Sequence, residues 1–344
     1  MKVSISAGAF ARSRPEELIQ YAQLADRLGV DCLWSAEAWG NDAITPLAFV
    51  AGHTSDIKLG TGIMQISARA PSMIAMTALT LSAFSNNRFI LGLGVSGPQV
   101  VEGLHGVPYR APLTRLKETV EIVRTAFRGE KLIFDGACHT LPRAGGEGKP
   151  IRLDHPPNPE IPVFLATLAP RSLEYTGAAA DGWLGTSFSP NYPEAHFQHL
   201  RRGAESAGRS LKDLELQAAC IVAIGPDVEA LIDARRPAVA FQMGAMGSAN
   251  TNFYNEAFQR AGFTEDALAI QSLWLEGKRK EAAARVPDAM VTEFGAIGTP
   301  DMVKERFQRY KDVGIDSLGI RIDGDLTARS ETLEQVMDLI NAVG

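Results

Sequence analysis

The sequence predicts a (β/α)8 (TIM) barrel with a helical insertion before its last strand, and three observations support this. Short apolar strands alternate with amphipathic helices, which is the pattern of a parallel sheet covered by helices. Eight strand candidates in 344 residues favour a closed barrel over an open doubly wound sheet. No linker divides the chain, so we expect a single domain over residues 1–344. The strand candidates are 2–8, 31–36, 57–65, 89–95, 162–166, 182–187, 215–223 and 317–322.

The first third of the chain shows the alternation most clearly. The strand VSISAG precedes a helix over SRPEELIQYAQLADRLG, in which Leu18, Tyr21 and Ala25 recur three or four residues apart on one face. Gly29 ends that helix, and the buried strand VDCLWSAE follows. The remaining elements are a helix over about 42–54, the strand IKLGTGIMQI, a helix over about 71–84 and the strand RFILGLGV.

Two later segments interrupt this rhythm. Residues 131–160 carry glycine and proline punctuation, which predicts a hairpin or a loop. Residues 226–297 contain several helical patterns and few strand signals, which predicts a helical insertion within the barrel. IPVFLATL and DGWLGTSF are further short apolar strands of the barrel type.

Composition excludes several classes of protein. The net charge of -6 and the pI near 5.6 argue against general nucleic-acid binding, which needs a clustered basic surface. The three cysteines are far apart without a C-x-x-C pair, so we expect no metal site and no disulfide framework, as in a reducing cytoplasm. The start MKVSISAGAFARS is too short and polar for a secretory signal, and no stretch approaches a membrane span. We therefore expect a cytoplasmic protein.

Gly92, Gly94 and Gly97 form a literal G-x-G-x-x-G, the spacing of a dinucleotide-binding turn. That motif needs its third glycine in the first turn of a helix and an acidic strand end about 20 residues later. Here Pro98 follows Gly97, and the segment about 20 residues on, TRLKETVEIV, is helical, so the nicotinamide interpretation fails. The glycines instead leave room for a barrel interior or a ligand, or they only ease packing. Ser96 and Gly97 then lie at the carboxyl end of a strand, where barrels carry their active sites.

Six stretches in order resemble the bacterial luciferase-like monooxygenase superfamily, and most closely its coenzyme F420-dependent branch. They are GVDCLWSAEAW, SDIKLGTGIMQISARAPSMIAM, NRFILGLGVSGPQVVEG, IPVFLATLAPRSLE, AADGWLG and GTPDMVKERFQRYKDVGID. This branch includes the F420-dependent methylene-tetrahydromethanopterin reductase and glucose-6-phosphate dehydrogenase types. The resemblance implies an oxidoreductase whose flat tricyclic cofactor lies across the carboxyl mouth of the barrel.

The resemblance also implies the parts of a cofactor site. A non-prolyl cis peptide that backs the ring falls at Gly62–Ile63, and a phosphate-binding loop runs from Ala166 to Ser172. From the residues alone, that loop is either an anion site at a helix start or an ordinary helix start. The cofactor-binding candidates are Glu37, Gly62, Ile63, Gln65, Gly94, Ser96, Gly97, Ala166, Thr167, Leu168, Ala169 and Arg171, and the substrate-pocket candidates are Phe10, Trp39 and Phe188.

Glu37 is the candidate catalytic residue, and the sequence departs from the family beside it. Ala38 stands where the family often has a histidine. Glu37 serves either as a hydrogen-bond partner or general acid/base if burial raises its pKa, or as a structural group that caps the next helix or pairs with an arginine. Basic loop residues that could receive an anionic cofactor tail, although such residues are usually solvated, are Arg69, Arg110, Arg143, Lys149, Arg152 and Arg171.

These observations lead to three candidate functions. The first is an oxidoreductase that transfers a hydride between coenzyme F420 and a small organic substrate. The second is an FMN-dependent two-component monooxygenase that uses reduced flavin and oxygen. The third is a non-catalytic flavin- or deazaflavin-binding protein. The family usually forms dimers, so we expect a homodimer that binds a small-molecule substrate and neither nucleic acid nor membrane.

Overall fold

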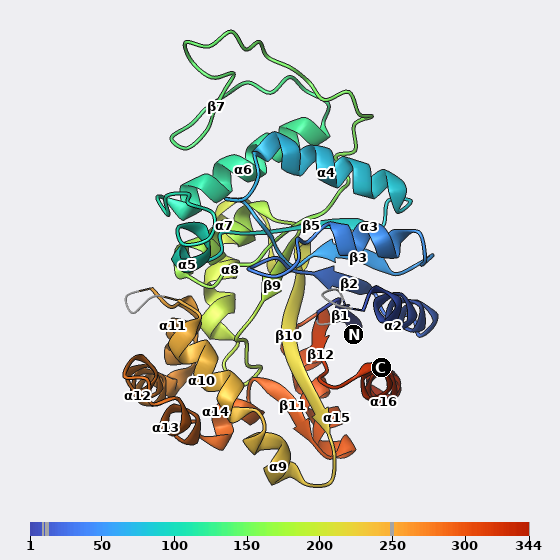
Figure 1. Ribbon diagram of the computed structural model, residues 1–344, viewed down its shortest axis with the longest axis vertical. Helices are drawn as coiled ribbons and strands as arrows, with labels where there is room; N and C mark the ends of the chain where they lie inside the picture. Colours follow the sequence, from blue (N-terminus) through green and yellow to red (C-terminus); the bar gives the residue numbers. More distant parts are fainter. Residues whose placement is uncertain (9, 11–13, 248–250, 344) are drawn as a thin grey trace. The chain divides into compact units, whose positions relative to one another are not determined.

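The structure, a computed structural model, describes residues 1–8, 10, 14–247 and 251–343. The chain divides into two compact units, one formed by Ala7–Ala166 and the other by Met1–Ser6 with Thr167–Gly344. In each unit, parallel strands alternate with helices along the chain (Figure 1). Each unit is described separately below.

The unit Ala7–Ala166 contains four parallel strands in the order β2-β3-β5-β8, and the short strand β4 also pairs with β5. The strands are β2 (Cys32–Ser35), β3 (Lys58–Thr61), β4 (Met64–Gln65), β5 (Phe89–Gly94) and β8 (Val163–Leu165). The helices are α2 (Pro15–Arg27), α3 (Thr45–Ala51), α4 (Pro71–Phe84), α5 (Pro98–Val101) and α6 (Pro112–Phe127). The strands β6 (Phe134–Asp135) and β7 (Thr140–Leu141) form an antiparallel hairpin, as expected for residues 131–160.

Two glycines on the strands of this unit leave space for neighbouring side chains. Trp34 on β2 is in register with Gly60 on β3, and a Cβ on Gly60 would lie 2.2 Å from the indole Cζ3. The indole also packs on Phe164 of β8, with ring centroids 5.9 Å apart. On β5, a Cβ on Gly94 would lie 2.8 Å from Cδ1 of Ile63. Gly60 and Gly94 therefore make room for side chains of the protein itself.

The unit that contains Met1–Ser6 and Thr167–Gly344 has the parallel strand order β9-β10-β12-β1, and β11 also pairs with β10. Its strands are β1 (Lys2–Ser6), β9 (Gly182–Gly185), β10 (Glu215–Ile224), β11 (Gly295–Gly298) and β12 (Ser317–Arg321). The helices that cover them are α7 (Pro170–Ala179), α8 (Glu194–Ser206), α15 (Pro300–Asp312) and α16 (Leu326–Val343), with a 3-10 turn η1 (Leu211–Asp213).

Residues 228–292 form a group of helices that share an apolar core, coloured yellow to orange-brown in Figure 1. They are α9 (Val228–Asp233), α10 (Arg236–Ala245), α11 (Phe253–Phe258), the π-helical turn η2 (Gln259–Phe263), α12 (Thr264–Leu275), α13 (Arg279–Ala284) and α14 (Asp288–Thr292). Buried side chains in this core include Val239, Met243, Phe258 and Ile270. The helical character expected for 226–297 ends earlier than expected, because 295–298 form strand β11.

All eight predicted strands are present at the predicted places in the chain. Among the parallel strands that the structure describes, the sequence missed only β11. Its four residues, GAIG, lack the run of β-branched or aromatic side chains that marks a strand. Its pairing with β10, rather than its own composition, makes it a strand.

Candidate functional site

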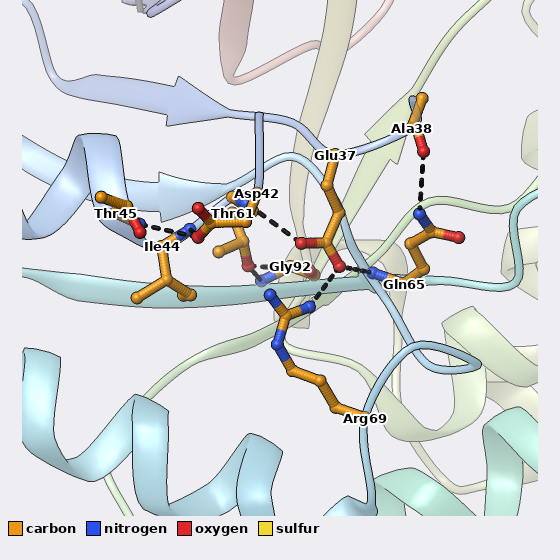
Figure 2. A network of polar contacts seen from close by, with 10 residues as sticks. Glu37, Ala38, Asp42, Ile44, Thr45, Thr61, Gln65, Arg69 and Gly92 are labelled. Atoms are coloured by element: carbon orange, nitrogen blue, oxygen red, sulfur yellow. Dashed lines mark hydrogen bonds and ion pairs between the residues drawn. The ribbon is translucent and has the colours of Figure 1, made fainter. Parts of the chain in front are cut away.

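A buried carboxylate organises the polar groups that follow strands β2 and β4 (Figure 2). Glu37 comes just after β2 and is 8% exposed. Its Oε1 accepts hydrogen bonds from the backbone amide of Gln65 (2.8 Å) and from Nη1 of Arg69. Its Oε2 accepts one from the backbone amide of Ala43 (3.0 Å). Both oxygens thus serve donors of the protein. Of the two sequence-based interpretations of Glu37, these contacts favour the structural one, pairing with an arginine.

The Gln65 side chain lies beside this carboxylate and has a fixed orientation. It is 1% exposed, and its Nε2 donates to the carbonyl oxygen of Ala38 (3.3 Å). Its Oε1 is buried and has no hydrogen-bond partner among the described residues. A buried acceptor without a donor costs about 1–3 kcal/mol, so a ligand N–H is the kind of group that would stabilise this site.

The peptide bond between Gly62 and Ile63, just after β3, is cis, as the family resemblance implied. The last residue of β2 and Glu37, which follows it, hydrogen-bond the two residues of this cis peptide. The Gly62 amide donates to the carbonyl of Ser35 (2.7 Å), and the Ile63 carbonyl accepts from the Glu37 amide (3.1 Å). The same Glu37 therefore contacts the cis segment through its backbone and Gln65 through its carboxylate.

Ser96 and Gly97 form the turn that follows β5. Ser96 has a φ of 58°, in the left-handed region that few non-glycine residues adopt. The phenol of Tyr109 donates a hydrogen bond to the Ser96 carbonyl (3.2 Å). Burial raises the pKa of Tyr109 to about 12, so the phenol keeps its proton at neutral pH and continues to donate. Gly97 directly precedes α5.

The predicted phosphate-binding loop connects β8 to α7. The Thr167 hydroxyl is hydrogen-bonded to that of Thr176 (2.7 Å), and the Thr167 carbonyl accepts from Nε1 of Trp183 (3.0 Å). In the described part of the chain, the backbone amides of Leu168, Ala169 and Arg171 have no acceptor. Free amides at the amino end of a ten-residue helix suit an anion, because the helix dipole favours negative charge there. Ala166, which precedes them, donates its amide to the Leu93 carbonyl (3.0 Å).

The structure places the three substrate-pocket candidates in different surroundings. Trp39 is 63% exposed. Phe10 is buried, and its ring centroid lies 5.3 Å from that of Tyr21. Phe188 is fully buried among aromatic rings that include Trp183 and Tyr310, so its side chain belongs to the core and not to a pocket wall. The sequence could not separate these cases, because an aromatic residue after a strand suits either role.

The basic residues divide similarly. Arg69 pairs with Glu37, whereas Arg110, Arg143, Lys149, Arg152 and Arg171 are exposed. Arg260, which the sequence analysis did not single out, reaches the predicted phosphate loop from η2 and donates its Nη2 to the Leu168 carbonyl (2.7 Å). The two residues are 92 positions apart, and no local pattern marks that contact.

The described residues contain neither a cluster of metal ligands nor a helix that could span a membrane. No group of three or more His, Cys, Asp or Glu side chains in that part of the chain is arranged to hold a metal ion. None of the helices in the described ranges is long and apolar enough to cross a membrane.

Known proteins resemble this chain over nearly its whole length. The family model described as luciferase-like monooxygenase matches residues 2–317. A Mycobacterium tuberculosis protein, named as a candidate coenzyme F420-dependent oxidoreductase, is 35% identical over 98% of both chains. A 5,10-methylenetetrahydromethanopterin reductase of Methanolobus tindarius is 28% identical over 88% of this chain and 89% of its own.

Among solved structures, the coenzyme F420-dependent tetrahydromethanopterin reductase from Methanopyrus kandleri superposes with a TM-score of 0.80. The match covers 99% of this chain and 98% of that one, at 22% sequence identity. At this identity the likeness shows the fold, which is the closed parallel (β/α)8 barrel that the strand pattern predicted.

Proposed function

The chain belongs to the luciferase-like monooxygenase family, and on that premise we propose that it is an oxidoreductase that uses the deazaflavin coenzyme F420. The reaction is hydride transfer between that cofactor and a small organic substrate. The names of the two relatives support this choice within the family. The observation that carries it in this chain is the set of free amides at Leu168, Ala169 and Arg171, which fits the phosphate of such a cofactor.

The proposed ring-binding residues lie in the unit Ala7–Ala166. They are the cis segment Gly62–Ile63, Gln65, and the β5 end with Gly94, Ser96 and Gly97. The unpartnered Oε1 of Gln65 fits an N–H at the edge of a deazaflavin ring. The Nε2 of the same side chain donates to the Ala38 carbonyl, so Oε1 points away from that carbonyl. Gly94 contributes by leaving room for the side chain of Ile63, which occupies the space that a Cβ at position 94 would take.

When bound, a deazaflavin carries a hydride on carbon and reacts poorly with oxygen, so the protein mainly has to bind and orient. In this chain Glu37 holds the Gln65 amide and Arg69, and Tyr109 holds the Ser96 carbonyl. That Glu37 also moves a proton stays a prediction. Its two oxygens already accept three hydrogen bonds, which supports a positioning role for it.

Titration of the purified protein with F420 and with FMN tests the proposal. We expect tight deazaflavin binding, followed by cofactor reduction or oxidation when a substrate panel is added. Tighter FMN binding, with oxygen consumption in the presence of a flavin reductase, would establish the monooxygenase alternative instead. Binding of either cofactor without turnover across a broad panel would support a non-catalytic binding protein.

Ala169→Pro tests the phosphate loop specifically. Ala169 has a φ of -75°, close to the value that proline requires, and its amide has no acceptor in the described structure. We therefore expect the variant to fold normally while losing one donor to the phosphate. Its Kd for F420 should rise about tenfold, as for loss of one charge-assisted hydrogen bond. Its Kd for the same deazaflavin without phosphate and tail should stay at the wild-type value, and an equal change for both ligands would contradict the assignment.

We further propose that the enzyme is a cytoplasmic homodimer. All three cysteines are free thiols, in keeping with a reducing compartment. An exposed apolar face on α4 consists of Met73, Met76 and Phe84, which are 48%, 45% and 75% exposed, and Phe49 of α3 is 45% exposed. Such a face is typical of a surface that a partner covers.

Sedimentation of Met76→Glu tests the dimer. We expect the wild-type protein to sediment as two chains of 37.0 kDa and the variant as one, because a buried unpaired carboxylate disfavours the interface. Ile151→Glu, on the long connection between β7 and β8, changes another exposed apolar residue and should leave the dimer intact. A wild-type monomer would end this proposal.

A further inference from the structure

Arg260 is a half-buried cation that makes no ion pair with the residues that the structure describes. Its Nη2 donates to the Leu168 carbonyl, and its Nε is buried without a hydrogen-bond partner. Among the described residues, no carboxylate lies within 4.0 Å of its guanidinium. Burial lowers the pKa of Arg260, and Glu256 on α11 offsets this effect only in part. Removing a charge from water without an ion-pair partner costs free energy, so an anionic ligand would stabilise Arg260.

Among the groups around Arg260, Glu256 attracts it without forming an ion pair, and the others are neutral or engaged elsewhere. His196 is 1% exposed, and burial together with the nearby Arg260 lowers its pKa to about 3, so the imidazole is neutral. Glu174 is engaged by Arg202 (3.1 Å). Glu194 is held by both terminal nitrogens of Arg201, at 3.0 and 3.2 Å.

Arg260 lines an open pocket of about 450 Å³ between η2 and the start of α8. The other lining residues are Asn191, Tyr192, Pro193, Glu194, Ala195 and Gln198. A second arginine adds positive charge behind this wall, since Arg306 is 8% exposed and donates its Nη1 to Oδ1 of Asn191 (3.2 Å). The Nε of Arg306 is also buried without a partner in the described structure. The pocket wall therefore combines the Arg260 guanidinium with neutral groups and with the Glu194 carboxylate, which Arg201 engages. Behind the wall, the Glu293 carboxylate interacts with Tyr192 and with Arg306, so Arg260 is the cation that the wall itself offers to a ligand.

We propose that this pocket binds an anionic oxygen group, a phosphate or a carboxylate, with Arg260 as its principal ligand. Two molecules could carry such a group: the acidic tail of the cofactor, which rests on the function proposed above, or an acidic substrate. Arg260 also hydrogen-bonds the Leu168 carbonyl, so it joins the pocket to the loop that carries the free amides. An arginine suits this role because its planar fork matches carboxylate and phosphate oxygens.

Three probes on Arg260→Gln separate these sources: F420 with its tail, the same deazaflavin without phosphate and tail, and inorganic phosphate. If the cofactor tail occupies the pocket, the Kd for F420 rises about tenfold or more, whereas the Kd for the tail-less compound stays unchanged. If an acidic substrate occupies it, both cofactor affinities stay at wild-type values. Inorganic phosphate then raises the melting temperature of the wild-type protein and not that of the variant.

Arg128→Gln is the matched control, because Arg128 is 47% exposed and its partner Glu130 is 53% exposed, so the change removes a surface arginine outside the pocket. If the glutamine variant fails to fold, Arg260→Lys replaces it. Lysine keeps the charge but not the planar fork, so the change in ligand affinity should be smaller than for Arg260→Gln. An Arg260 variant that matches wild type with all three probes overturns the inference. If the wild-type protein does not bind F420, the proposed cofactor is wrong. The melting temperature with inorganic phosphate then still tests the role of Arg260.

Discussion

Replacement of Gly203 by alanine should lower the free energy of unfolding by about 3 kcal/mol or more, at the upper end for overpacked sites. A Cβ on Gly203 of α8 would lie 1.8 Å from the Glu174 carbonyl oxygen of α7, and one on Gly177 of α7 would lie 2.0 Å from the Leu200 carbonyl oxygen. Both obstacles are backbone atoms, so no side-chain rotation can relieve the clash. The two helices must separate and lose the packing between them.

Urea unfolding followed by circular dichroism measures this change. Gly52→Ala is the control, because no atom lies within 4 Å of a Cβ at Gly52 and its φ of -79° suits any residue. We expect that control to stay within about 0.5 kcal/mol of wild type. Because the free amides lie at the start of α7, a shift of this helix by Gly203→Ala should also weaken F420 binding. Equal unfolding midpoints for Gly203→Ala and wild type would show that the helices tolerate a wider spacing.

The second large effect is expected at the ion pair between Glu37 and Arg69. The two side chains are 6% and 20% exposed, so Arg69→Met leaves a buried carboxylate without its counter-charge. We expect a loss of about 3 kcal/mol in the free energy of unfolding, the lower end for breaking a buried pair because Arg69 is partly exposed. The same change should weaken cofactor binding, because Glu37 also holds the Gln65 amide.

A double-mutant cycle isolates the pair. Arg69→Met combined with Glu37→Gln should cost about 1–3 kcal/mol less than the sum of the single changes, because the glutamine removes the charge that the first change leaves unpaired. Arg201→Met breaks an exposed ion pair with Glu194 and should cost less than about 1 kcal/mol. Additive single and double changes at Glu37 and Arg69 would mean that the two side chains do not stabilise each other.

Much of the fold follows from local patterns in the chain. In the apolar run IPVFLATL, the residues that pair as strand β8 are buried. Leu18, Tyr21 and Ala25 are buried on one face of α2, as their spacing predicted. The cis bond at Gly62–Ile63 was expected from the family resemblance, and the structure confirms it. Strand β11 was missed because its pairing with β10, and not its own composition, defines it.

The candidate site was predicted less completely, and the reason is again physical. From the residues alone, two interpretations were open for Glu37 and two for the loop that begins at Ala166, an anion site or an ordinary helix start; the family resemblance implied phosphate binding at that loop. For Glu37, the distinction came from Arg69, which is 32 residues away. Phe188 lies in the core because of the aromatic rings around it, and those rings come from β9, α8 and α15.

The sequence by itself determined the alternation of strands and helices, the (β/α)8 class and the family, because periodicity and ordered motifs are local properties. Only the tertiary structure decided which charges are paired. It joined Glu37 to Arg69 and left Arg260, beside the Leu168 carbonyl, without an ion pair among the described residues. The balance between desolvation and attraction depends on which side chains the fold brings together, and no spacing along the chain encodes it.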